Sequence, residues 1–85
     1  MKPRNLDTVA ERRKEKKDFA IHFGKYLRKI REEKNISQEN LSLKAGYYRT
    51  YVGKIEQGLY SPSFHTVWRL AQALETSLSD LLKKF

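Results

Sequence analysis

The chain of 85 residues contains no cysteine, so neither disulfide bonds nor thiolate metal sites stabilise it. No apolar run approaches the roughly 20 residues of a membrane-spanning helix, and no signal-peptide apolar stretch follows the basic N-terminus. Only two histidines occur, His22 and His65, and neither has a cysteine or a paired carboxylate beside it in a catalytic or metal-ligating spacing. These absences favour one soluble, cytoplasmic domain that is not an enzyme and binds no cofactor or metal.

Positive charge is in excess. The chain has 18 Lys and Arg side chains against 10 Asp and Glu, a net charge of +8. Residues 1–18 hold seven basic and four acidic side chains, and residues 19–85 hold eleven and six. The excess therefore belongs to the body of the chain as well as to its beginning. It favours a polyanionic partner, namely DNA, RNA or an anionic membrane surface.

Residues 1–18 contain few apolar side chains and cannot form a core of their own. Two interpretations stay open: a flexible arm or frayed helical lead-in, and a basic arm that follows a phosphate backbone or enters a minor groove. Good helix formers begin near Asp7, so the first helix has room to start early. We expect residues 19–85 to form one folded domain.

Apolar residues recur at helical spacing from Phe19 onward and predict a first helix. Its expected inward side chains are Phe19, Phe23, Leu27 and Ile30. The helix ends near Asn35, which tolerates the left-handed conformation. Ser37 is then a suitable N-cap for a second helix over residues 38–45.

A third helix is predicted over residues 49–57, between two glycines that suit its ends. Gly46 permits a tight turn before it, and Gly58 is a suitable C-cap residue after it. The periodicity places Tyr48, Val52 and Ile55 on one face, and Arg49, Thr50, Gly53 and Lys54 on another. A helix with one aliphatic face and one polar face is expected to be anchored from behind.

Two further helices follow Pro62. Ser63 is a suitable cap for the fourth, whose apolar face contains Phe64, Val67, Trp68, Leu70, Ala71 and Leu74. Ser77 and Asp80 fit a capping box that opens a short fifth helix. Five helices with short loops leave no room for a sheet, so the predicted fold is all-α.

Five motifs stand at fixed offsets along residues 23–82: LR–IRE in the first helix, SQ opening the second, the turn glycine, IE–G ending the third, and SP before the fourth. Together they resemble the Xre/Cro-type, lambda-repressor-like helix-turn-helix domain. The stretch RTYVG is also similar to controller proteins of restriction–modification systems. The resemblance implies a five-helix DNA-binding domain with its helix-turn-helix at about residues 37–58.

In this family the third helix lies in the DNA major groove and the second crosses the backbone. The resemblance implies base contacts at Arg49, Thr50 and Lys54, with Tyr48 at the helix start. Arg49 suits a guanine edge, and a bidentate contact of that kind discriminates by about 1–3 kcal/mol. The family's backbone-binding glutamine corresponds to Gln38. Further candidates for phosphate contacts are Lys44, Tyr51, Tyr60 and Ser63.

The resemblance also implies how the third helix is held. Arg31 and Glu56 match a family ion pair that ties the first helix to the end of the third. Tyr48 stands where the family has a small N-capping residue, so that cap comes from elsewhere or is absent. Gly53 either lets the backbone approach the DNA closely or is simply tolerated inside the helix.

One helix-turn-helix reads few base pairs, so the family acts as a two-fold dimer on half-sites about 34 Å apart. Our hypothesis is a homodimer formed through the fourth and fifth helices, and the alternative is that their apolar residues complete the monomer core. The side chains concerned are Leu78, Leu81, Leu82, Phe85 and Trp68.

The function implied by the resemblance is sequence-specific regulation of transcription, as a repressor or autoregulator bound to double-stranded DNA. Two other functions stay open. An antitoxin or protein-interaction module would use the same fold to mask a toxin. An RNA or membrane-surface binder would act through residues 1–18, so it would keep binding after Arg49→Ala and lose it when those residues are deleted.

Overall fold

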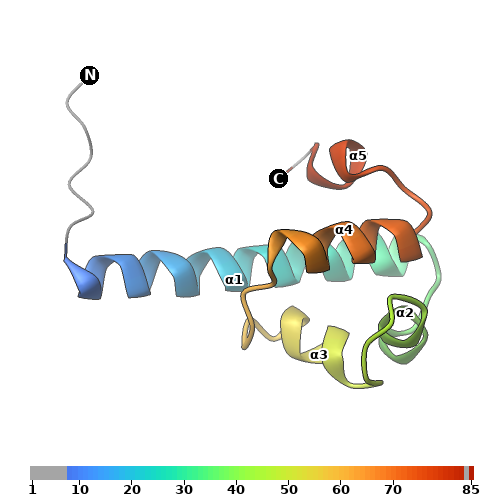
Figure 1. Ribbon diagram of the computed structural model, residues 1–85, viewed down its shortest axis with the longest axis horizontal. Coiled ribbons are helices and arrows are strands. Elements are labelled where there is room, and N and C mark those ends of the chain that lie inside the picture. The colour runs from blue at the N-terminus through green and yellow to red at the C-terminus, as the bar shows by residue number, and fades with distance from the viewer. Residues whose placement is uncertain (1–7, 84) are drawn as a thin grey trace.

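The computed structural model describes residues 8–83 and 85, so the first seven residues of the predicted arm lie outside the described part. The described chain forms five α-helices and no strand (Figure 1). They are α1 (Val9–Glu33), α2 (Gln38–Lys44), α3 (Tyr51–Glu56), α4 (Phe64–Ala73) and α5 (Leu78–Leu82). The prediction of an all-α, five-helix fold is confirmed.

The first helix starts early, as its good helix formers indicated. The Thr8 side chain caps it by accepting a hydrogen bond from the Glu11 backbone N–H at 3.1 Å. It runs for 25 residues, and Asn35 just beyond it has the left-handed φ of 56°. Its first turns project beyond the other helices, which gather around its second half (Figure 1).

The core lies between the second half of α1 and helices α2 to α5. The apolar side chains that contribute to it most fully are Phe23, Leu27, Leu41, Val52, Ile55, Leu70 and Leu81. Phe19 was predicted to point inward, but it is half exposed and packs edge-on against Phe85 instead. Ala20 is the first buried residue of α1, because no other helix covers the turns before it.

Serine caps start three of the helices, as predicted. The side chains of Ser37, Ser63 and Ser77 each accept a hydrogen bond from the backbone N–H three residues later, at 3.0, 3.1 and 3.0 Å. Each cap satisfies one of the N–H groups that a helix leaves without an internal partner. The N-terminal ends of α2, α4 and α5 are therefore fixed by local sequence.

α3 packs closely against α1 because a glycine lies between them. A Cβ atom on Gly24 would stand 2.4 Å from the Ile55 carbonyl oxygen and 2.9 Å from that of Glu56. α4 lies on the other side of the core, where Val67, Leu70 and Ala71 are buried. Phe64 was predicted on that inward face, but 73% of it is exposed because it opens the helix beyond the core.

Candidate nucleic-acid interface

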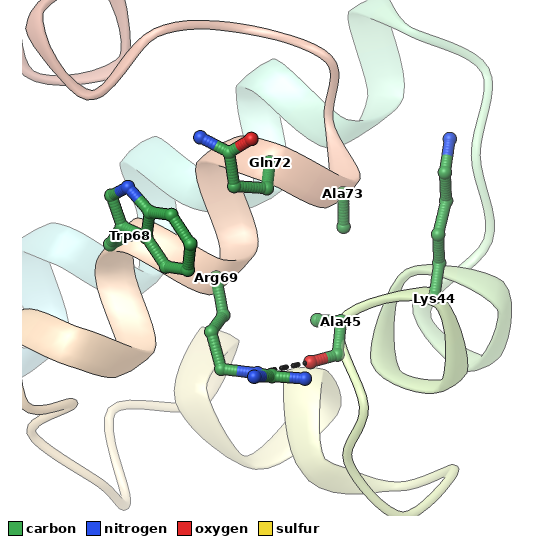
Figure 2. A pocket seen from close by; sticks show the side chains of 6 residues that line it. All are labelled: Lys44, Ala45, Trp68, Arg69, Gln72 and Ala73. Atoms are coloured by element: carbon green, nitrogen blue, oxygen red, sulfur yellow. Dashed lines mark hydrogen bonds between the residues drawn. The ribbon is translucent and has the colours of Figure 1, made fainter.

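The turn between α2 and α3 depends on Gly46, which has a φ of +89°. A Cβ atom there would lie 2.3 Å from an Arg69 guanidinium nitrogen. Arg69, from α4, donates its Nε–H to the Ala45 carbonyl at 2.8 Å (Figure 2). Its guanidinium also lies 5.9 Å from the centre of the Tyr47 ring. The turn is therefore fastened to α4, which fixes the direction in which α3 leaves it.

α3 begins two residues later than predicted. Arg49 and Thr50 lie in the turn before it, and the N-cap residue Thr50 makes no side-chain cap hydrogen bond. The missing cap comes from another helix, because the buried Ser42 hydroxyl of α2 accepts from the Val52 backbone N–H at 2.9 Å. The same hydroxyl donates to the Gln38 carbonyl at 2.8 Å. Ser42 thus fixes the start of α3 from behind, a role that sequence reasoning missed.

The outer side of α3 lines a groove that we call the α3 groove. Its lining residues are Gln38, Glu39, Arg49, Thr50, Gly53, Lys54, Gln57 and Leu59. Four predicted contact residues, Gln38, Arg49, Thr50 and Lys54, therefore meet on one surface. Sequence reasoning did not include Glu39, whose carboxylate is the kind of group that accepts a hydrogen bond from cytosine N4.

The end of α3 is held by an ion pair with α1. Arg31 Nε lies 2.6 Å from Glu56 Oε2, and Arg31 Nη2 lies 3.1 Å from Glu56 Oε1. The side chains are 11% and 3% exposed, so little water reaches the pair. The hydrogen bond to Glu56 raises the pKa of Arg31. Arg31 also donates to the Ile36 carbonyl at 2.8 Å, which joins the loop before α2 to the same network.

Gln38 connects this network to the α3 groove. Its Nε2 donates to Glu56 Oε1 at 3.0 Å, so the amide is oriented by α3. A Cβ atom on Gly53 would lie 3.2 Å from Gln38 Oε1. The absence of that Cβ therefore leaves room for the Gln38 amide beside α3, which gives Gly53 a packing role between the two helices.

Lys54 lies between two tyrosine rings at the other side of the groove. Its Nζ is 5.4 Å from the centre of the Tyr48 ring and 5.9 Å from that of Tyr60, within reach of a cation–π attraction. The Tyr48 hydroxyl donates to the Tyr60 hydroxyl at 3.4 Å. That hydrogen bond raises the pKa of Tyr48 to about 12 and, together with the Lys54 charge, lowers the pKa of Tyr60.

The periodicity predicted that Tyr48 shares the buried face of Val52 and Ile55. This prediction is wrong. About half of Tyr48 is exposed, because it lies three residues before Tyr51, where the backbone has not yet entered α3. Tyr51 packs against it edge-on and stacks on Tyr47 with 4.4 Å between ring centres. The tyrosines form a continuous aromatic surface beside the α3 groove.

The remaining predicted phosphate contacts lie apart from the groove. Lys44 is at the end of α2, where it pairs with Glu75 at 3.4 Å and lines a pocket with α4 (Figure 2). Ser63 is occupied as the cap of α4, where it also donates to the Thr66 hydroxyl at 3.1 Å. Their predicted DNA contacts stay predictions.

The predicted dimer surface divides between core and exterior. Leu81 is only 1% exposed and belongs to the monomer core, so it has no surface to offer a partner. Phe85 packs against rings of α1, including Phe23 and Tyr26. Trp68 lines the same pocket as Lys44 (Figure 2), and 44% of it is exposed. Leu82 is 36% exposed.

Clusters of metal-ligating side chains and membrane-spanning helices are absent from residues 8–83 and 85. These residues contain no group of three or more His, Cys, Asp or Glu side chains able to hold a metal ion. Within the same ranges, no helix has both the length and the apolar character needed to cross a membrane.

Comparison with known proteins identifies the family. A helix-turn-helix family model matches residues 27–81, well over half of the chain. The chain belongs to the Xre-like helix-turn-helix family. Members of this family are DNA-binding transcriptional regulators rather than enzymes, and the matched span contains α2, α3 and the α3 groove.

Controllers of restriction–modification systems are among its relatives in the family. The control protein C.SmaI of Serratia marcescens is 38% identical over 79% of this chain and 80% of its own. The control protein C.MunI of a Mycoplasma species is 35% identical over 75% and 88%. The crystal structure of the restriction-modification controller protein C.AhdI from Aeromonas hydrophila superposes with a TM-score of 0.72. It is 35% identical, with 78% of this chain and 96% of that chain covered.

Proposed function

We propose that this helix-turn-helix regulator reads a specific double-stranded DNA sequence through the α3 groove and acts as a repressor or autoregulator. The observation that carries the proposal is the convergence of Arg49, Thr50 and Lys54 on one exposed surface whose backbone is held rigidly from behind. Side chains that read base edges must be placed by a scaffold that does not itself move on binding.

The groove residues have suitable chemistry for the DNA major groove. Arg49 presents a planar fork of donors that matches the O6 and N7 acceptors of guanine. Lys54 is able to reach similar acceptors one turn later, and the two tyrosine rings around it limit its freedom. Thr50 offers a hydroxyl to a base or a methyl group to thymine.

Other groups position the protein on the backbone. Gln38 lies at the start of α2, beside the groove, where its amide contacts a phosphate in the proposed complex. The hydroxyls of Tyr51 and Tyr60 are at the aromatic surface next to Lys54 and serve the same purpose. Such contacts fix the register of α3 without distinguishing one base from another.

We further propose that two copies of the chain bind two half-sites related by two-fold symmetry. A helix of six residues reaches only a few base pairs, so specificity in a genome requires a second reading unit. The exposed apolar side chains of α4 and the C-terminal segment, Trp68 and Leu82, are the proposed contacts, supplemented by Leu78 and Phe85.

Similarity to C.SmaI, C.MunI and C.AhdI supports a role in controlling the genes of a restriction–modification system. On this proposal the target DNA includes the region upstream of the protein's own gene. Loss of the regulator would then change the expression of neighbouring methyltransferase and endonuclease genes, which transcript measurements would detect.

The central test is footprinting on DNA upstream of the protein's own gene, with the parent protein and Arg49→Ala. We expect a two-fold symmetric footprint that Arg49→Ala weakens by about 1–3 kcal/mol per half-site while losing selectivity at one base position. Arg28→Ala is the matched control, because it removes the same charge from an exposed α1 residue paired with Glu32. Identical protection by all three proteins would contradict the proposal.

The dimer has its own test. Sedimentation of the parent protein should show a dimer at micromolar concentration or on DNA, and Leu82→Glu should shift it toward monomer by placing a charge in an apolar contact. A monomer under every condition, with or without DNA, would contradict dimerisation and leave the reading of a single half-site intact.

A further inference from the structure

The first turns of α1 carry a charge pattern that the proposed reading of bases does not use. From Val9 to Phe19 every residue of this helix is exposed, and no other helix covers it (Figure 1). A 25-residue helix is about 37 Å long, and these first turns make up roughly 16 Å of it. They carry side chains past the end of the helix packing, where the loop after α3 is their neighbour.

Three basic residues of the extension share one face. Arg13, Lys16 and Lys17 are spaced at i, i+3 and i+4, and Ala20 and Gly24 continue the same stripe into the core. We call the surface formed by Arg13, Lys16 and Lys17 the basic face. It is the outward continuation of the face with which α1 packs on α3.

The acidic residues of the extension lie on the opposite side. Glu11, Glu15 and Asp18 are spaced at i, i+4 and i+7, which places them together on a second stripe. Lys14 belongs to that side and pairs with Asp18 at 3.3 Å. A helix that only needed solubility would have no reason to separate its charges in this way, because mixed charges serve that purpose equally well.

The basic face adjoins the proposed DNA-binding surface. Its three side chains line a groove whose opposite side consists of Gly58, Leu59 and Ser61, in the loop after α3. Gly58 lies so close to α1 that a Cβ atom there would stand 2.7 Å from Ile21 Cγ1. The loop therefore lies directly against α1.

Leu59 and Lys16 connect the α3 groove and the aromatic surface to the basic face. Leu59, which is largely exposed, lines both the α3 groove and the groove beside the basic face. Lys16 also lines the hollow formed by Tyr48, Tyr51 and Tyr60. A path of cationic and aromatic side chains therefore leads from α3 to the first turns of α1.

We propose that the basic face is a second DNA-binding site, which holds backbone phosphates of the duplex outside the base pairs that α3 reads. The inference rests on the proposed function, because it needs α3 to be seated in the major groove. Three cations on one face match the spaced negative charges of a phosphate backbone, and the acidic stripe is turned away from it. The site adds affinity and extends the footprint without selecting a sequence.

The test compares two triple variants with the same loss of charge. Arg13→Gln, Lys16→Gln and Lys17→Gln together remove the basic face, and glutamine preserves helix propensity. Lys14→Gln, Lys25→Gln and Lys29→Gln remove three exposed cations from the other side of α1. Affinity for the footprinted DNA is measured over a range of salt concentrations for the parent protein and both variants.

We expect the basic-face variant to lower the slope of log K against log salt by about 2.7, which corresponds to three lost phosphate contacts. Affinity at about 0.1 M salt should fall at least about tenfold, with little change in base selectivity. The control variant should keep nearly the parent slope. Equal slopes for the two variants would overturn the inference.

DNA length provides a second readout. The parent protein and the control variant should bind more weakly when the duplex is trimmed to the base pairs that α3 reads, whereas the basic-face variant should be insensitive to trimming. Equal dependence on flanking DNA in all three proteins would overturn the inference. So would a basic face that favours single-stranded RNA over this duplex.

The failures of the two proposals are distinguishable. If Arg49→Ala changes the footprint but both triple variants behave alike, base reading by α3 stands and the flanking site is wrong. If Arg49→Ala has no effect while the basic face sets the salt dependence, the proposed sequence-specific function is wrong.

Discussion

The inner side of α3 is buried in the core, and the outer side is exposed. Val52 and Ile55 on its inner side have no exposed surface, whereas Arg49 and Thr50 at its start are exposed along the α3 groove. A helix of six residues is far too short to be stable alone, so its shape depends on the inner side. Rigidity therefore depends on the buried residues of α3, whereas recognition is proposed for exposed residues of α3 and of the turn before it. Changes on the inner side should affect folding, and changes on the outer side should affect binding.

The largest expected effect comes from Glu56→Ala. It removes the partner of Arg31, whose side chain is only 11% exposed, and leaves a buried charge without compensation. We expect the free energy of unfolding to fall by about 3–5 kcal/mol. Urea unfolding followed by circular dichroism measures it. Asp18→Ala is the control, because the exposed Lys14–Asp18 pair should contribute less than about 1 kcal/mol. Equal losses in both variants would mean that the Arg31–Glu56 pair behaves as a surface pair.

Gly24→Ala tests the close approach of α1 and α3. Alanine is favoured in a helix by about 1 kcal/mol over glycine, but its Cβ would stand 2.4 Å from the Ile55 carbonyl. A backbone atom cannot turn aside as a side chain can, so the clash should outweigh the propensity. We expect a net loss of about 1–3 kcal/mol. Thermal unfolding would show this as a lowered Tm, and a raised Tm would mean that the helices separate freely.

Ser42→Ala tests which residue caps α3. Without the Ser42 hydroxyl the buried Val52 N–H loses its acceptor, which should cost about 1–2 kcal/mol of folding stability. Thr50→Ala is the sharper half of the experiment, because Thr50 occupies the N-cap position but makes no cap hydrogen bond. Its effect on unfolding should stay within about 0.5 kcal/mol. If Thr50→Ala were the more damaging change, the cap would be local after all.

Local signals in the sequence predicted most of the fold. Ser37, Ser63 and Ser77 were recognised as caps because each bonds the backbone three residues later, within the reach of a local pattern. The burial of Phe23 and Leu27 was predicted because the buried side chains of a helix recur at helical spacing in the sequence. Features of this kind depend only on neighbours along the chain.

The errors lie where one helix depends on another. The start of α3 was placed too early because its cap comes from Ser42, ten residues before Val52. The one sequence signal for this cap was the polar residue Ser42 among the inward positions of α2. Phe19 was placed inward because periodicity marks a face but not where its covering helix ends. The α3 groove combined predicted contacts with Glu39 and Leu59, which only the packing of α2 and the loop after α3 brings there.

Tyr48→Phe should have the smallest effect on stability, because it removes one hydroxyl from the exposed surface beside α3. At neutral pH we expect the midpoint of urea unfolding to stay close to that of the parent protein. The hydrogen bond to Tyr60 raises the pKa of Tyr48 to about 12, so its contribution is complete below the unfolded value of about 10 and is lost as pH rises through about 12. The pKa of Tyr60 is lowered, so its contribution is complete above the unfolded value and is lost as pH falls through the lower folded value.

Removing the Tyr48 hydroxyl should therefore move the pKa of Tyr60 upward toward its ordinary value, while the Lys54 charge continues to lower it. Ultraviolet titration of the phenolates measures this shift directly. Lys54→Gln should move the same titration in the same direction, since it removes the second cause. If neither change shifts the first phenolate to form, the Tyr48–Lys54–Tyr60 arrangement does not persist in solution, and these side chains are free to rearrange against DNA.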